Sequence, residues 1–164
     1  MWTFSDGAWR TADGQTPHLT ADHIAPAAAV LTLRMPPGTP SQVALDALIV
    51  ATETGITQFQ IGRLEGDLYS VQLPPPPTAA RDFAVIHTGV SGMRVSAPGG
   101  AEHHVECDPC GQASDWSTEG VGDALDAAGT GEVLVSVSPT VPWGAALAAF
   151  EASGERTLRI GREL

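Results

Sequence analysis

The densest group of residues that could carry chemistry lies between positions 102 and 110. It reads Glu102-His103-His104-Val105-Glu106-Cys107-Asp108-Pro109-Cys110. Cysteine thiolates and histidine nitrogens are preferred ligands of Zn²⁺, so the composition points to a candidate zinc site. However, consecutive side chains of an extended segment point to opposite sides, so only one of the two histidines could join both thiolates. The ligand set is therefore incomplete, and we predict no metal or cofactor.

The spacing Cys107-x-x-Cys110 has two other interpretations. A redox centre needs this motif at the start of a helix, where the helix dipole lowers the pKa of a thiol, whereas Gly111 and Gln112 follow here without a helical pattern. A disulfide between Cys107 and Cys110, or two free thiols that hold a surface loop, is the simpler interpretation. A disulfide would favour an oxidising compartment. A thiol or metal protein is kept as the alternative function.

Two tryptophans stand where helices are expected to begin. Trp116 and Trp143 could offer aromatic surface to a protein partner. They could equally anchor a core that has few other large side chains. Elsewhere, the serines lack a nucleophile elbow, and no glycine-rich phosphate loop follows a strand. We find no catalytic constellation and predict that the chain is not an enzyme.

The charge of the chain narrows its partners. The formal net charge is −11, and all eight basic residues are arginines. A surface this acidic repels phosphate backbones and anionic lipid, so we predict no binding to nucleic acid or to lipid headgroups. No apolar run approaches the roughly 18 residues of a spanning helix, so we predict no membrane segment in the sequence given.

The elements that must position these residues occur twice. A strand over 30–35, a Pro-initiated apolar stretch and a strand ending near Gly62 are echoed by 133–138, a second Pro-initiated stretch and a strand ending near Gly161. Such an internal repeat indicates two similar folding units. Further strands are predicted over 68–73, 82–87 and 93–97, and helices over 41–54, 117–128 and 143–152.

Local signals refine the beginning of the chain. Asp6-Gly7 supplies the positive φ angles of a tight hairpin turn, which would set Phe4 opposite Trp9. Thr20 can cap a short helical segment that runs through Ile24. The polar segment 101–115 has no counterpart in the first half.

These elements predict an α+β fold of two βαβαβ-like repeats, each a hairpin, helix, strand, helix and strand. We expect small mixed sheets with helices on one face, lying side by side or continuous across a pseudo-twofold axis. Residues 1–73 form the first repeat and residues 82–164 the second. The linker is 74–81, because its four prolines cannot join the interior of a sheet.

The second repeat resembles a known family. The run Gly131 to Trp143, an Ala/Leu helix, Gly154 and a strand ending Leu158-Arg159-Ile160-Gly161 is similar to the periplasmic domain of the ExbD/TolR biopolymer transport proteins. In that family a strand ends in a short polar turn, a valine and an aromatic or proline open the next helix, and that helix stops at glycine. Residues 83–95 and 117–129 resemble the leading hairpin and first helix, and the first half follows the template more loosely.

The resemblance implies a non-enzymatic binding or scaffold domain of a cell-envelope complex, located in the periplasm or envelope. Its implied partner is a protein similar to ExbB/TolQ, with peptidoglycan as a further candidate. Domains of this family dimerise, so a tandem copy implies an intramolecular pseudo-dimer. The proton-carrying aspartate of the family lies in a transmembrane helix, so no acidic residue here is given that role. A cytoplasmic adaptor of the same architecture is the other alternative.

Overall fold

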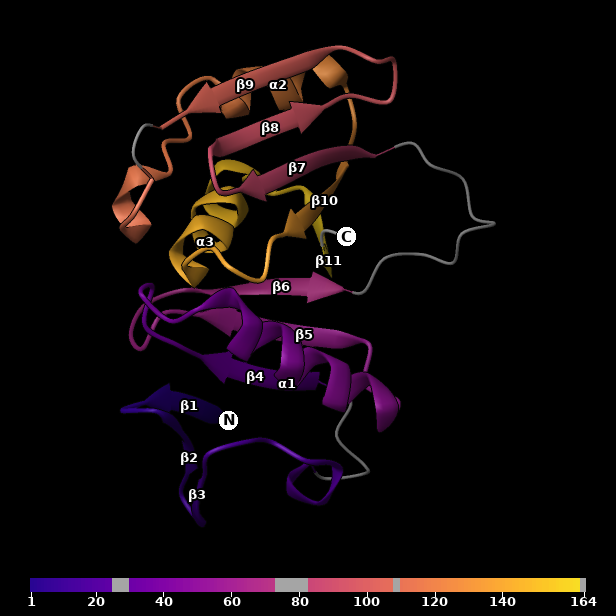
Figure 1. Cartoon of the computed structure of the whole chain (residues 1–164). Helices are drawn as coiled ribbons and strands as arrows, with labels where there is room; N and C mark the ends of the chain where they lie inside the picture. Colours follow the sequence, from indigo (N-terminus) through magenta and orange to yellow (C-terminus); the bar gives the residue numbers. More distant parts are fainter. Residues whose placement is uncertain (25–29, 73–82, 108–109, 163–164) are drawn as a thin grey trace.

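The structure is a computed structural model that describes residues 1–24, 30–72, 83–107 and 110–162 (Figure 1). The strands are β1 (Trp2–Ser5), β2 (Ala8–Thr11), β3 (Gly14–Thr16), β4 (Val30–Arg34), β5 (Gln58–Gly62), β6 (Leu68–Gln72), β7 (Ala84–Gly89), β8 (Gly92–Ser96), β9 (Glu102–Glu106), β10 (Glu132–Val137) and β11 (Thr157–Arg162). The helices are α1 (Ser41–Glu53), α2 (Val121–Ala128) and α3 (Trp143–Ala152), with two 3₁₀ turns, η1 (Ala21–His23) and η2 (Ala113–Asp115).

All of these strands belong to one mixed sheet. Its order is β3-β2-β1-β4-β5-β6-β11-β10-β7-β8-β9, so strands β1 to β6 occupy one end and β7 to β11 the other (Figure 1). The junction is β6, which runs antiparallel to β5 and parallel to β11. At that junction Val71 is opposite Leu158 and Gln72 is opposite Arg159. One strand of the first half therefore joins the two halves into a continuous sheet.

The predicted fold class is wrong. Instead of two small sheets of the ExbD/TolR-like βαβαβ pattern, the described residues form one eleven-stranded sheet. The first predicted helix is only the turn η1, which Thr20 caps as expected. The segment 101–115 contains strand β9, which pairs with β8 as β3 pairs with β2. The segment therefore does have a counterpart in the first half, contrary to the prediction. The open edges that separate sheets would leave are closed by β6.

The same pairings nevertheless recur in both halves. Strand β4 lies between β1 and β5 in parallel, and β10 lies between β7 and β11 in parallel. The predicted Asp6-Gly7 turn is confirmed, because both residues have positive φ and Phe4 is opposite Trp9. The predicted linker 74–81 lies outside the described residues, so the boundaries of the repeats stay a prediction.

One face of the sheet is buried along the central strands and half-buried or exposed at β1, β3 and β9. Its side chains form rows that cross from strand to strand, for example Leu31, Phe59, Val71, Leu158, Val133 and Ala84. Buried side chains of all three helices, such as Leu45, Leu125 and Phe150, belong to the same core. Because side chains alternate along a strand, the opposite face carries Thr3, Arg34, Arg94 and Arg159. We call this the open face.

The two halves also meet where α1 and α3 begin. Pro40 and Pro142, which precede these helices, form an antiparallel bridge. Four backbone hydrogen bonds flank it: Ser41 N to Val141 O (3.0 Å), Trp143 N to Thr39 O (2.7 Å), Gln42 N to Pro139 O (3.1 Å) and Gly144 N to Pro37 O (2.7 Å). The first N–H groups of a helix have no acceptor inside it. Each helix is therefore capped by carbonyl groups from the other half.

This junction is tightly packed at Gly144. A Cβ atom there would lie 2.5 Å from the Ala113 Cβ and 3.1 Å from the Pro37 carbonyl oxygen. We expect Gly144→Ala to lower the free energy of unfolding by about 2 kcal/mol, as overpacking does, measured by urea unfolding. Gly122→Ala is the matched control, because Gly122 is likewise the second residue of its helix and a Cβ there meets only the Ala152 oxygen at 3.9 Å. The control should be unchanged or more stable by up to about 1 kcal/mol. Equal stabilities of the two variants would contradict the packing.

Candidate functional site

The two cysteines lie just after β9. Their sulfurs form a disulfide between Cys107 and Cys110. His103 and His104 point to opposite sides of the strand, as an extended segment requires. The His103 Nε2 atom lies 3.1 Å from the Glu119 carbonyl oxygen near the start of α2. Within the described parts of the chain, no three His, Cys, Asp or Glu side chains are grouped so that they could hold a metal ion.

The chain after the disulfide is held by Asp115. The N–H groups of Gly111 and Gln112 each donate to the Asp115 Oδ2 atom at 2.7 Å. Donors aimed at a carboxylate favour its charged form. The hydrogen bonds from Gln112 and Gly111 therefore lower the pKa of Asp115 below its ordinary value.

Both predicted contact tryptophans lie in the core. Trp143 is fully buried and meets the Phe150 ring edge-on, with the ring centroids 6.1 Å apart. Trp116 is 5% exposed, and its indole N–H donates to the Gly89 carbonyl at 2.8 Å. This burial favours the packing interpretation over the protein-contact interpretation.

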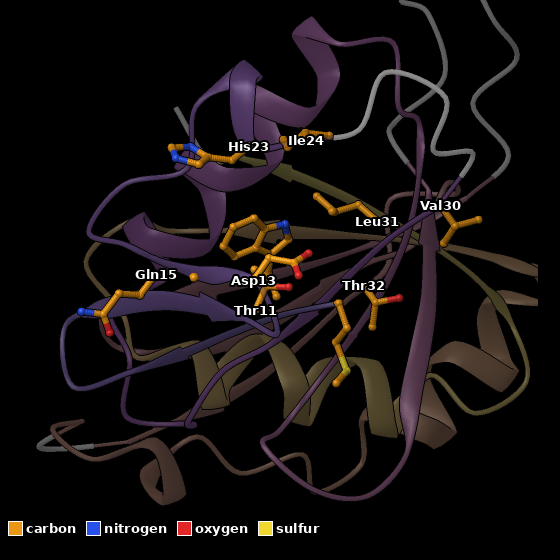
Figure 2. A pocket seen from close by; sticks show the side chains of 11 residues that line it. Thr11, Asp13, Gln15, His23, Ile24, Val30, Leu31 and Thr32 are labelled. Atoms are coloured by element: carbon orange, nitrogen blue, oxygen red, sulfur yellow. The ribbon is translucent and has the colours of Figure 1, made fainter.

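A separate cleft of about 510 Å³ opens in the first half of the sheet. It is lined by Met1, Trp2, Thr11, Asp13, Gly14, Gln15, His23, Ile24, Val30, Leu31 and Thr32. Figure 2 shows Ile24 and Leu31 on one side of the cleft and Thr11 and Asp13 across from them. These residues come from β1, β2, β3, η1 and β4, so the cleft depends on the register of strands that are distant in sequence.

The cleft passes through the plane of the sheet. Trp2 and Leu31 reach it from the buried face, whereas Gln15 and Thr32 reach it from the open face. A hollow on one surface of a sheet would be lined from that surface alone. The geometry is that of a gap between strands.

Comparison of the two halves explains the gap. Strand β10 pairs with β7 at five residues, from Val133 to Val137. Its counterpart β4 pairs with β1 only at Leu33 and Arg34. Among the residues that the structure describes, no strand pairs with Leu31 or Thr32 on that side. We call the gap beside Val30–Thr32 the β1 lane, because it continues the line of β1 beyond Met1.

The walls of the β1 lane are apolar toward the core and polar toward the open face. His23 is held at the rim, where its Nδ1 atom accepts the Thr20 N–H at 3.0 Å. A backbone N–H can only donate, so the proton of the neutral His23 ring lies on Nε2. The His23 ring also meets the Trp2 ring edge-on at 6.0 Å. His23, Trp2 and Asp13 could contact the backbone and side chains of a bound peptide. They do not form a pair of nucleophile and base.

Sequence reasoning did not find the β1 lane. Neither His23 nor Asp13 belongs to a motif in the sequence. The signal that could have found it is the repeat itself. Aligning the strand at 30–35 with that at 133–138 sets Trp2 level with Ile86, so β1 starts two residues later along its neighbour than β7 does.

No family model, curated protein or solved structure matches this chain. The resemblance to the ExbD/TolR family thus stays a prediction drawn from the residues, and the fold that it implied is corrected above. None of the helices in the described ranges is long and apolar enough to cross a membrane.

The carboxylate of Asp115 provides a test by pH. Its pKa is lowered on folding, so its two hydrogen bonds persist above the ordinary value of 3.8 and are lost only as the pH falls through the lower, folded pKa. We expect the amide proton shifts of Gly111 and Gln112 to titrate together with a midpoint below 3.8. NMR spectra between about pH 2 and 6 measure this midpoint. Asp115→Asn should abolish the titration, and a midpoint at or above 3.8 would contradict the geometry.

The disulfide gives a second test. We expect the protein, purified without reductant, to show no thiol reactive toward Ellman's reagent, and its mass to rise by about 2 Da on reduction because each sulfur gains one hydrogen. Cys107→Ser/Cys110→Ser should lose at most about 2 kcal/mol of stability, since the closed loop is short. Two reactive thiols in the native protein would instead favour the thiol-protein alternative.

Proposed function

We propose that this chain is a non-enzymatic protein-binding module that accepts an extended segment of a partner protein in the β1 lane. The observation that carries the proposal is the unequal pairing of β4 and β10. A strand edge without a partner offers a row of N–H and C=O groups to another backbone. Strand addition to such an edge is a common mode of peptide recognition.

The second half indicates the kind of segment that would be accepted. There, Ala84 lies opposite Val133 on the buried face, and Val85 lies opposite Leu134 on the open face. The equivalent positions of β4 are Leu31 and Thr32, so the segment should place a small apolar side chain toward the core. The residue before it would face the open side, because the place opposite Thr32 is level with Met1. Backbone pairing would supply affinity, and these two positions would supply selectivity.

Charge adds a preference. Asp13 is the carboxylate that lines the β1 lane, and the whole chain carries a net charge of −11. Opposite charge accelerates encounter and disfavours wrong partners. The partner segment should therefore carry lysine or arginine next to its apolar residue.

The setting of this activity is a further proposal, supported only by the residue resemblance. It would be a cell-envelope complex with an ExbB/TolQ-like protein or with peptidoglycan nearby. A cytoplasmic adaptor would use the same β1 lane. Fractionation of cells that express the natural coding frame distinguishes the two settings, because envelope and cytoplasmic proteins separate.

The β1 lane is tested with a peptide that copies its counterpart. The probe is a synthetic acetylated peptide of residues 82–84, Asp-Phe-Ala, preceded by one lysine. Residues 85–87 are left out because their counterparts, Met1, Trp2 and Thr3, already occupy the line of β1. We expect saturable shifts of the Leu31 and Thr32 amide signals in NMR spectra at millimolar peptide, because these are the backbone groups beside the gap. The absence of any shift there at saturating peptide would contradict the proposal.

A variant that fills the β1 lane from within sharpens the test. Adding Asp-Phe-Ala ahead of Met1, as in residues 82–84, should abolish the peptide-dependent shifts and raise stability by about 1 kcal/mol through added burial. Adding Gly-Ser-Gly is the control and should leave binding intact. Equal binding by both extended chains would exclude the β1 lane as the site. A longer natural product whose own leading residues prevent binding would exclude a partner in trans.

A further inference from the structure

Three nitrogen-bearing side chains form a row on the open face of the second half. The register of β7, β8 and β9 sets His87 opposite Arg94 and Arg94 opposite His104. Side chains in such a row have Cβ atoms about 5 Å apart, so one small ligand can touch neighbouring members. In a chain with a net charge of −11, this is an unusual concentration of hydrogen-bond donors.

A cavity of about 290 Å³ lies against the row. His87, Arg94, His104 and Glu106 line it together with the hairpin tip at Gly89 and Gly92. Gly92 cannot carry a side chain, because a Cβ atom there would lie 2.1 Å from the Val105 carbonyl oxygen. The tip thus leaves open the space in front of the arginine.

The first half has an equivalent row, in which the arginine is hydrogen-bonded to acceptors within the protein. Arg10 occupies the position equivalent to Arg94. Arg10 lies two residues after the hairpin pair Ser5–Ala8, and Arg94 lies two residues after the hairpin pair Gly89–Gly92. The Arg10 Nε atom donates to the Ser5 hydroxyl at 3.1 Å. Its Nη1 atom donates to the Gln15 side-chain oxygen. Two acceptors on the flanking strands therefore hold this guanidinium within the protein.

Neither of these two contacts is present for Arg94 among the residues that the structure describes. Gly89 stands where the first half has Ser5, and His104 stands where it has Gln15. The Arg94 Nε atom is buried and has no hydrogen-bond partner among the described residues. A buried donor without an acceptor is costly, so this arrangement indicates an acceptor from outside the chain. The cavity lies where that acceptor would sit.

We propose that this cavity, the Arg94 site, binds a carboxylate group. A guanidinium presents a planar fork of donors that matches the two oxygens of a carboxylate. Phosphate has the same geometric match but carries more negative charge. Glu106 lines the cavity, and Glu102 lies beside it, 3.2 Å from the His104 Nε2 atom. These two carboxylates disfavour a dianion more than a monoanion, so the Arg94 site selects a single carboxylate.

The Arg94 site is tested with three anions at pH 7 and constant ionic strength: acetate, N-acetylglycine and inorganic phosphate, with chloride as the balancing ion. The readout is the NMR signal of the Arg94 Nε–H group and of the Gly92 amide. We expect saturable shifts with both carboxylates, at least threefold tighter than with phosphate. Tighter phosphate binding would overturn the choice of carboxylate, and no saturable shift with any anion would overturn the Arg94 site itself.

Variants separate ligand binding from folding. Arg94→Gln should weaken acetate binding at least tenfold, whereas the matched Arg10→Gln should leave it unchanged because Arg10 is satisfied within the protein. Glu106→Gln should tighten binding about threefold by removing a like charge. Acetate binding by Arg94→Gln equal to that of the parent protein would overturn the proposal, as would equal losses in the two arginine variants.

The sharpest variant restores the acceptors of the first half. Gly89→Ser/His104→Gln supplies the Ser5 and Gln15 equivalents, and a Cβ atom at Gly89 meets only the Gly92 oxygen at 3.9 Å. We expect this variant to keep the thermal stability of the parent and to lose acetate binding at least tenfold. The restored acceptors should compete with acetate for the Arg94 guanidinium. Retained acetate binding in a folded double variant would therefore overturn the proposal. The result is independent of the β1 lane, whose peptide shifts should persist.

Discussion

The structure depends on the way in which the helices α1 and α3 begin. Helix N-termini need acceptors from outside the helix, and Pro40 and Pro142 offer no side-chain oxygen for that purpose. The acceptors come instead from the opposite half, through the hydrogen bonds that flank the Pro40–Pro142 bridge. The first N–H groups of each helix therefore need the other half as their hydrogen-bond acceptor. The same contact holds the two halves together beside the face of the sheet that they share. The long sheet and the reciprocal caps are thus two parts of one constraint.

The two copies of the repeat share the same strand pairings, and both candidate sites lie at positions where the copies differ. The β1 lane lies where β4 pairs with β1 at two residues while β10 pairs with β7 at five. The Arg94 site exists because the second copy has lost the acceptors that hold Arg10. Each half can therefore be compared with the other, position by position. A difference between equivalent positions in one chain, under one set of conditions, is stronger evidence than an isolated cavity.

Features set by neighbouring residues could be predicted from the sequence. The turn at Asp6-Gly7, the opposition of Phe4 and Trp9, and the end of α1 before Gly55 all follow from local geometry. The choice between sheets side by side and one continuous sheet could not, because it depends on β6 pairing with a strand about ninety residues away. Strand β9 was hidden by its charged residues, which an outer strand tolerates and a central strand does not. The β1 lane arises from the register between β1 and β4, and the Arg94 site arises from the pairing of β9 with β8, and composition encodes neither pairing.

The closed surroundings of the β1 lane have a consequence for stoichiometry. A strand that docks on the outer edge of a sheet creates a fresh edge, and growth can continue from there. The β1 lane is bounded by β4 on one side and by the β2–β3 turn on the other, so a bound segment would expose no new edge. The outer strands of the sheet also disfavour the addition of another strand, since β3 has only three residues and β9 has a glutamate at each end. In the proposed mode of binding, each chain would hold one segment, and binding would not lead to polymerisation.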